Sequence, residues 1–198
     1  MPKSSAARVR VVPFDPAWSW RYEAEAARLR AGLDLRDFEI HHIGSTAMRG
    51  VFAKPVIDML LVVADLNALD ARGDGMRGLG YEVKGEYGIP GRRYFRLSTA
   101  DGIRTHQLHA FASGSAEAMR HLAFRDYMNA HPHAAQAYSD LKRGLAHRFP
   151  VHMAGYVEGK ASFIRQHEAL AIGWQQRKER ADEAASESSS TRGDAAQA

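Results

Sequence analysis

The sequence contains no cysteine among its 198 residues. Disulfide bonds, thiolate catalysis and cysteine-ligated metal sites are therefore excluded, and this absence fits a reducing compartment. Long apolar runs are also missing, because none approaches the roughly 18 residues that a membrane-spanning helix needs. No dense lysine and arginine block with interleaved aromatic residues is present, which argues against nucleic acid as a partner. We expect a cytoplasmic protein with no membrane partner.

Charge is spread unevenly along the chain, whose net charge is +4. The stretch 181–198 is net acidic and rich in serine and alanine, so the rest of the chain is more basic than the whole. A basic body favours an anionic partner, such as a nucleotide or another phosphorylated small molecule. We expect residues 1–8 and 181–198 to be disordered, because they offer little to bury. The sequence does not indicate an oligomeric state.

The order of the expected secondary structure predicts an α+β fold. Asp15-Pro16 predicts a helix start, and apolar residues recur at helical spacing after it. Strand-like segments cover 38–43, 56–63, 81–84, 93–97 and 105–111, with a weak helix within 67–79 and helices over 116–130, 132–148 and 154–178. Strands first and helices afterwards indicate a small mixed sheet flanked by helices over 9–112. A helical C-terminal subdomain over 113–180 would pack on that core.

The most informative motif is Gly44-Ser45, followed by Lys54 and then by Asp58 in an apolar strand. A glycine turn can bring backbone N–H groups and the Ser45 and Thr46 hydroxyls close to a phosphate. Lys54 could neutralise phosphate charge, and Asp58 could hold a hard cation such as Mg²⁺ beside it. The alternatives are a plain turn, an exposed lysine, and a salt bridge of Asp58 to a nearby cation.

Several segments carry a resemblance to a known family. They are Pro13 to Trp18, His42 to Asp58, Arg92 to Phe95, His106 to His109, Phe124 to Tyr127, and Tyr156 with Lys160. These segments resemble the GrpB-like family, a branch of the nucleotidyltransferase superfamily, over residues 9–174. The resemblance implies a nucleotidyltransferase-like fold and a nucleoside triphosphate bound with Mg²⁺. It also implies transfer of a nucleotidyl group to a hydroxyl or amine of an unknown acceptor.

One position departs from the superfamily pattern. Nucleotide-transferring members usually carry two acids, separated by one residue, on the strand after the turn. Here Asp58 occupies the first of these positions, and Leu60 occupies the second. The second ligand for two-metal chemistry is thus missing from this strand. Whether the chain is an enzyme stays open, and the alternative is an inactive nucleotide-binding or phospho-ligand-binding module, or an adaptor for an acidic partner.

Two histidines and two arginines are further candidates. His106 or His109 could orient or deprotonate an acceptor, because histidine titrates near neutral pH, or could be structural. Their spacing on a strand turns the two side chains to opposite faces, which disfavours a shared zinc site. Arg92 and Arg93 follow a glycine-rich loop, and one of them could grip a phosphate while the other faces solvent.

Two lysines on the C-terminal helices complete the candidate site. Lys142 and Lys160 each follow a tyrosine by four residues, Tyr138 and Tyr156, so each pair shares one helix face. Either lysine could reach a phosphate from the helical subdomain. An exposed lysine is the alternative.

Overall fold

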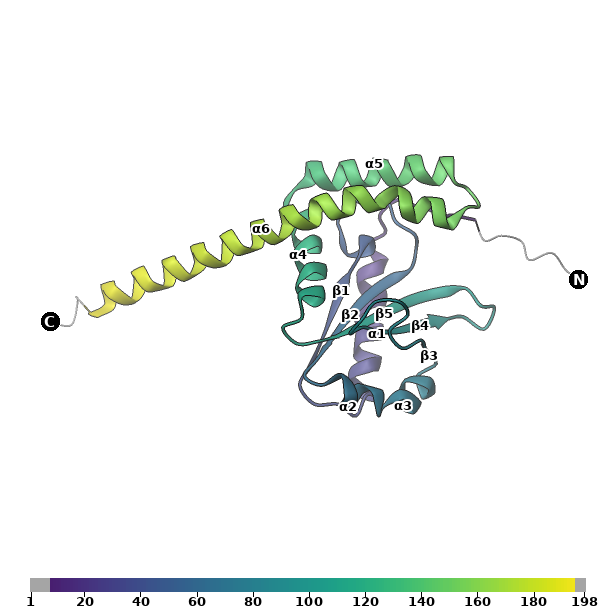
Figure 1. The fold of residues 1–198 in the computed structure, drawn as a ribbon, viewed down its shortest axis with the longest axis horizontal. Helices are drawn as coiled ribbons and strands as arrows, with labels where there is room; N and C mark the ends of the chain where they lie inside the picture. The colour runs from purple at the N-terminus through teal and green to yellow at the C-terminus, as the bar shows by residue number, and fades with distance from the viewer. Residues whose placement is uncertain (1–7, 195–198) are drawn as a thin grey trace, which may run out of the picture.

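The computed structural model describes residues 8–194, and its centre is one mixed five-stranded sheet (Figure 1). The strands lie in the order β1 (Phe38–Ile43), β2 (Ile57–Val63), β5 (Arg104–Ala112), β4 (Arg93–Ser98) and β3 (Glu82–Val83). β2 and β5 are parallel, and the other neighbouring pairs are antiparallel. This arrangement confirms the predicted α+β class.

Helix α1 (Ala17–Gly32) covers one face of the sheet. It begins where the sequence predicts, and the Asp15 carboxylate accepts a hydrogen bond of 2.9 Å from the Ala17 N–H. Trp18 and Leu29 are buried in the cluster that also holds Met59 and Leu108 from the two central strands. Burial of such side chains contributes roughly 1.5–3 kcal/mol each, so this layer supplies much of the stability.

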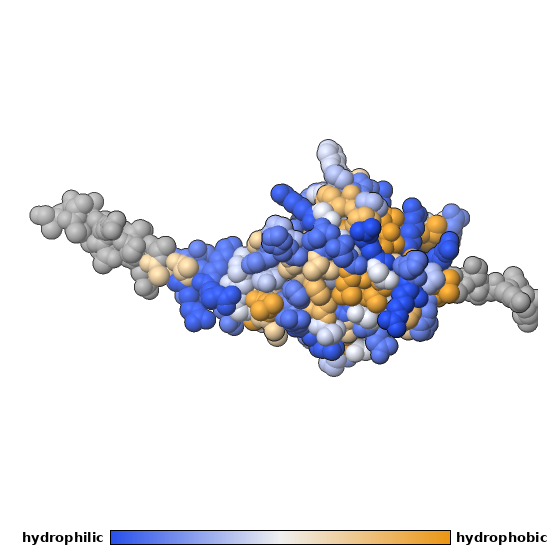
Figure 2. Space-filling view, turned by 90° about the horizontal axis from the view of Figure 1, so that it is seen from above, coloured by the Kyte–Doolittle hydropathy of each residue, from blue (hydrophilic) through white to orange (hydrophobic). Residues whose placement is uncertain are grey.

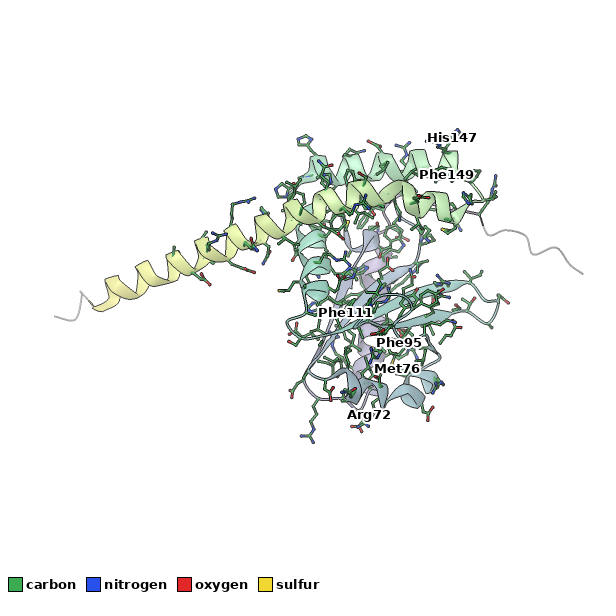
Figure 3. All side chains as sticks on the ribbon, in the orientation of Figure 1. Arg72, Met76, Phe95, Phe111, His147 and Phe149 are labelled. Carbon is green, nitrogen blue, oxygen red and sulfur yellow. The ribbon has the colours of Figure 1, made fainter. Side chains whose placement is uncertain are left out.

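The expected helix within 67–79 is divided into two short helices, α2 (Leu66–Asp70) and α3 (Gly73–Gly78). Three glycines in the second half disfavour a longer helix, since each costs about 1 kcal/mol relative to alanine. The two helices lie at one end of the sheet, where Met76 and Phe95 join the core (Figure 3).

Helix α4 (Ala116–Ala130) lies against the other face of the sheet. Leu60, Phe111 and Ala118 meet there in a separate apolar cluster. Helices α5 (Pro132–Arg148) and α6 (Met153–Asp194) follow and run side by side across one end of the sheet (Figure 1). Viewed from above, this end shows apolar residues lying among hydrophilic ones (Figure 2).

Helix α6 is longer than the sequence suggested and projects beyond the body of the molecule (Figure 1). The expected end at residue 178 was wrong, because the backbone stays helical to Asp194, through part of the segment expected to be disordered. Alanine, glutamate, lysine and arginine favour helix through residues 177–187.

Residues 1–7 and 195–198 lie outside the described residues. Within 8–194, no helix is long and apolar enough to cross a membrane.

The segment between β1 and β2 is held by hydrogen bonds from the helices. The Phe52 N–H donates to the Ser139 hydroxyl at 2.9 Å. The Asn129 side chain donates to the Ala47 carbonyl and accepts from the Arg49 N–H, both at 3.0 Å. The short 3-10 helix η1 (Ser45–Ala47) is therefore fixed between the sheet and the C-terminal helices.

Candidate functional site

A small cavity of about 60 Å³ opens where η1, β2, β5 and α6 meet. Its lining comprises Ser45, Thr46, Lys54, Val56, Asp58, Gln107, Tyr156 and Lys160. The structure thus brings together five side chains that the sequence singled out, from segments as far apart as residues 45 and 160. The remaining three lining residues were not assigned a role from the sequence.

Gly44 positions Asp58 through its unusual backbone. Its φ of 66° and ψ of −170° belong to a region that only glycine occupies without strain. Ile43 pairs with Asp58 across β1 and β2, so the turn begins directly beside the carboxylate. A Cβ on Gly44 would lie 2.6 Å from Asp58 Oδ2. The glycine is therefore needed for both the turn and the place of the carboxylate.

Asp58 is held by a chain of polar side chains from the neighbouring strands. Gln107 lies beside it in the parallel register and donates from Nε2 to Asp58 Oδ1 at 2.9 Å. The Tyr94 hydroxyl on β4 donates in turn to Gln107 Oε1. Burial raises the pKa of Asp58 to about 6, against the attraction of nearby lysines, which favours the ionised form.

The charges of two lysines on the helices act on this carboxylate. Lys160 Nζ lies 4.6 Å from the centre of the Tyr156 ring, and Lys142 Nζ lies 4.3 Å from that of Tyr138. The prediction that each tyrosine–lysine pair shares a face is thereby confirmed. Lys142 is only 1% exposed and is not among the residues that line the cavity. Burial lowers the pKa of Lys142 to about 7 and that of Lys160 to about 8, and the Asp58 charge partly offsets both shifts.

The third lysine comes from the segment that leads into β2. A backbone pair between Val12 and Ala53 fixes this segment, with N–H to carbonyl distances of 2.9 and 3.0 Å. Lys54 follows directly, and its Nζ lies 3.7 Å from Met153 Sδ at the start of α6. Burial lowers the pKa of Lys54, and the charge of Asp58 opposes that shift. The charges of three lysines thus act on one carboxylate, and two of these lysines, Lys54 and Lys160, line the cavity with it.

The structure does not bring the two candidate histidines to this cavity. His106 projects to the α1 face, where its environment includes Glu25 and Arg21. His109 is on the Asp58 face but is covered by His121, with ring centres 5.6 Å apart. Burial lowers the pKa of His109 to about 3, so this ring is neutral near pH 7. The positions of both histidines agree with a structural role, which was the alternative to a role in catalysis.

The two candidate arginines contact protein groups instead. The buried Arg92 side chain donates to the carbonyls of Glu86 and Tyr87, at 3.1 and 2.7 Å, and so holds the preceding loop. Arg93 forms a paired contact with the Asp70 carboxylate at 2.6 and 2.7 Å. Neither arginine lines the cavity around Asp58.

The donor set around Asp58 does not fit a resident Mg²⁺. Leu60 takes the place of a second carboxylate on this face of β2 and is fully buried against Ile43 and Phe111. Asp58 is the only acid among the residues that line the cavity. Within the part of the chain that the structure describes, no three His, Asp or Glu side chains gather as metal ligands. Mg²⁺ needs several oxygen ligands, whereas this site supplies ammonium groups.

Comparison with known proteins places this chain in a family. The sequence model of the family described as "GrpB protein" matches residues 8–170. The chain belongs to the GrpB family. Its sequence is 38% identical over 167 residues to the UPF0157 protein YqkA of Bacillus subtilis, covering 84% of this chain. It spans only 48% of YqkA's length, about half of that relative.

A solved structure agrees with the GrpB assignment. The crystal structure of the conserved protein GrpB from Enterococcus faecalis is 35% identical, with a TM-score of 0.79 over 84% of this chain and 99% of that chain. A more distant likeness is to the Cid1 poly(U) polymerase in its MgGTP-bound structure, at 13% identity and a TM-score of 0.46. It covers 63% of this chain and 41% of that one.

In this GrpB protein, Gln107 and Tyr94 are parts of the site that were not predicted from the sequence. Gln107 stands between the two histidines that drew attention, and its importance depends on the parallel pairing of β2 with β5. Tyr94 becomes relevant only through its contact with Gln107. Strand alternation alone indicates that Gln107 faces away from His106, but the partner strand is a property of the folded sheet.

Proposed function

We propose that this GrpB protein binds a phosphorylated small molecule at the cavity beside Asp58, with a nucleotide as the first candidate. The observation that supports this most is that Lys54 and Lys160 line the cavity together with a single carboxylate, while the buried Lys142 adds a third positive charge nearby. Repulsion between clustered ammonium groups raises the free energy of their protonated forms. An anionic ligand offsets this repulsion. Phosphate is the common biological anion that lysine binds as a compact point charge.

The turn at Gly44 supplies the second part of the proposed site. Ser45 and Thr46 line the same cavity, and a hydroxyl can donate a hydrogen bond to a phosphate oxygen. Thr46 Oγ1 is also 2.9 Å from His42 Nε2, which orients it. A phosphate would then contact hydroxyls on one side and ammonium groups on the other. This is the arrangement by which proteins hold phosphates with both charge and direction.

Nucleotidyl transfer is the second candidate function. The observation in its favour is Asp58, whose pKa of about 6 leaves it ionised at neutral pH and able to accept a proton from an acceptor hydroxyl or amine. The family resemblance suggests a nucleoside triphosphate with Mg²⁺ as the donor. Because the lining residues do not fit a resident cation, Mg²⁺ would have to arrive with the triphosphate, and we assign no step to it.

The test is the thermal stability of the whole chain with each nucleoside triphosphate, with and without Mg²⁺. A ligand at about 100 times its dissociation constant stabilises the folded state by roughly 2.7 kcal/mol, enough for a clear shift. We expect stabilisation by at least one nucleotide and its loss in Lys160→Gln. The matched control is Lys178→Gln, since Lys178 is exposed on the same helix.

Two results would contradict the proposal. Stability unchanged by every nucleotide and by inorganic phosphate would favour the adaptor function, and a protein partner would then be sought by pull-down. Binding and turnover left unchanged by Asp58→Asn would remove Asp58 from the site. Release of pyrophosphate in the presence of an acceptor would add transfer to binding.

A further inference from the structure

Lys142 is the least satisfied charged group of the site. Its side chain is 1% exposed, and its Nζ has no hydrogen-bond partner among the described residues. A buried ammonium group without a partner costs several kcal/mol, so such positions are rare unless a partner arrives. The group rests on the Tyr138 ring, and the other charges that act on it are Lys160 and Asp58. A bound anion would supply both the hydrogen-bond acceptor and the counter-charge that this group lacks.

The charges around the cavity are not balanced. The charges of Lys54, Lys142 and Lys160 act on the single carboxylate of Asp58, which already accepts a hydrogen bond from Gln107. With all three lysines protonated, the four groups carry an excess of two positive charges. A phosphomonoester near neutral pH carries close to two negative charges, because its second pKa is about 6. The site thus matches a phosphate dianion in charge.

A divalent cation would increase this imbalance. Only Asp58 offers a carboxylate, and Leu60 fills the position of a second one with packed apolar surface. The lysines already supply the positive charge that Mg²⁺ gives to phosphate elsewhere. The cavity is also small, at about 60 Å³. That space suits one phosphoryl group.

We propose that this site binds the dianionic phosphate of a phosphomonoester directly on Lys54 and Lys160, with the buried charge of Lys142 behind them and without a divalent cation. The inference rests on the phospho-ligand function proposed above and specifies its ligand class. It makes the lysines the replacement for the metal that the resemblance implies. The Ser45 and Thr46 hydroxyls would complete the contacts to the phosphate oxygens.

The test is calorimetric titration of the whole chain with inorganic phosphate, a nucleoside monophosphate and a nucleoside triphosphate. Each is measured in EDTA and again in excess Mg²⁺. We expect phosphate and the monophosphate to bind in EDTA, with no gain in affinity from Mg²⁺. Binding of a triphosphate only when Mg²⁺ is present would overturn this inference and leave the proposed function intact. Absence of binding in every arm would overturn both.

Two variants separate direct recognition from a metal site. Lys142→Met should weaken phosphate binding in EDTA at least tenfold, while Lys178→Met should leave it unchanged. Asp58→Asn removes the negative charge but keeps the shape and the acceptor for Gln107, so it should strengthen metal-free phosphate binding severalfold. A metal ligand would behave oppositely, and weaker binding in Asp58→Asn would refute the inference even if Lys142→Met failed to fold.

Discussion

Gly44 shows how one residue can fix the geometry of a whole site. Any other residue would be unfavourable here for two separate reasons. Its backbone would be strained at the left-handed φ, and its Cβ would lie 2.6 Å from Asp58 Oδ2. We expect Gly44→Ala to lower the free energy of unfolding by about 2–4 kcal/mol, because backbone strain and a clash add together. Urea denaturation measures this change.

Gly50 provides the matched control for that prediction. Its φ of 72° is similarly left-handed, but a Cβ there meets nothing within 4 Å. Gly50→Ala should therefore carry the strain alone, about 1–2 kcal/mol. Equal costs for the two variants would show that the contact with Asp58 does not matter. A larger cost at Gly44 isolates the clash.

Lys142 makes stability depend on pH in a direction that can be worked out. Its pKa is about 7 in the folded state and 10.5 as an ordinary lysine. Between these values the unfolded chain binds more protons, so stability should rise with pH, by at most about 1.4 kcal/mol per pH unit for one such group. Below pH 7 the full cost of burying the charge is present.

Lys142→Met should remove that contribution. We expect the variant to be more stable than the parent at pH 7, by about 1–4 kcal/mol, because a buried charge gives way to an apolar side chain of similar length. Its stability should also rise less steeply between pH 7 and pH 10. Urea denaturation across this range measures both effects, with Lys178→Met as control. A steep rise that persists in the variant would assign it to another group.

At the scale of an element, the loop before β4 separates the roles of its two arginines. Arg92 is buried and donates to two loop carbonyls, whereas Arg93 forms a more exposed ion pair with Asp70. Arg92→Met should cost about 2–3 kcal/mol, since the two loop carbonyls that Arg92 holds lose a charged donor. Arg93→Met should cost about 1 kcal/mol or less.

Hydrogen exchange provides the direct measurement of this difference. Amides of residues 86–92 should exchange faster in Arg92→Met and remain close to the parent in Arg93→Met. Phosphate affinity should stay within about twofold of the parent in both, because neither guanidinium lines the cavity. A large loss of affinity in Arg93→Met would return that residue to the binding site.

The elements themselves were largely predictable from the sequence, and their pairing was not. The apolar run in β2 and the helical spacing of apolar residues in α4 and α5 are properties of the local sequence. The first and last residues of these elements could therefore be predicted from the sequence. The place of Gln107 beside Asp58 requires the parallel contact of β2 with β5, across 49 positions. Lys142 could be placed on a helix face, but its burial depends on how α5 and α6 pack over the sheet.

At the scale of the whole molecule, the site joins the sheet to the C-terminal helices. Asp58 lies on β2 and Lys160 on α6, while the Val9 N–H bonds the Pro150 carbonyl at 2.9 Å and Val9 packs with Tyr156. Arg125 on α4 also donates to the His42 carbonyl at 3.1 Å. The expected core over 9–112 and the expected helical subdomain over 113–180 are thus in contact at several places.

We therefore expect the core and the helices to unfold in one cooperative transition. Trp18 is buried in α1, and Trp174 packs against Tyr127 and His131 in the helical part, so the two report on different regions. One variant, Trp20→Phe with Trp174→Phe, keeps Trp18, and another, Trp18→Phe with Trp20→Phe, keeps Trp174. In each, urea transitions by fluorescence and by far-ultraviolet circular dichroism should coincide. If the Trp174 fluorescence changes at a lower urea concentration than the circular dichroism, the helices unfold before the core. Phosphate should then raise the urea midpoint of the Trp174 transition, because the proposed site needs both the core and the helices.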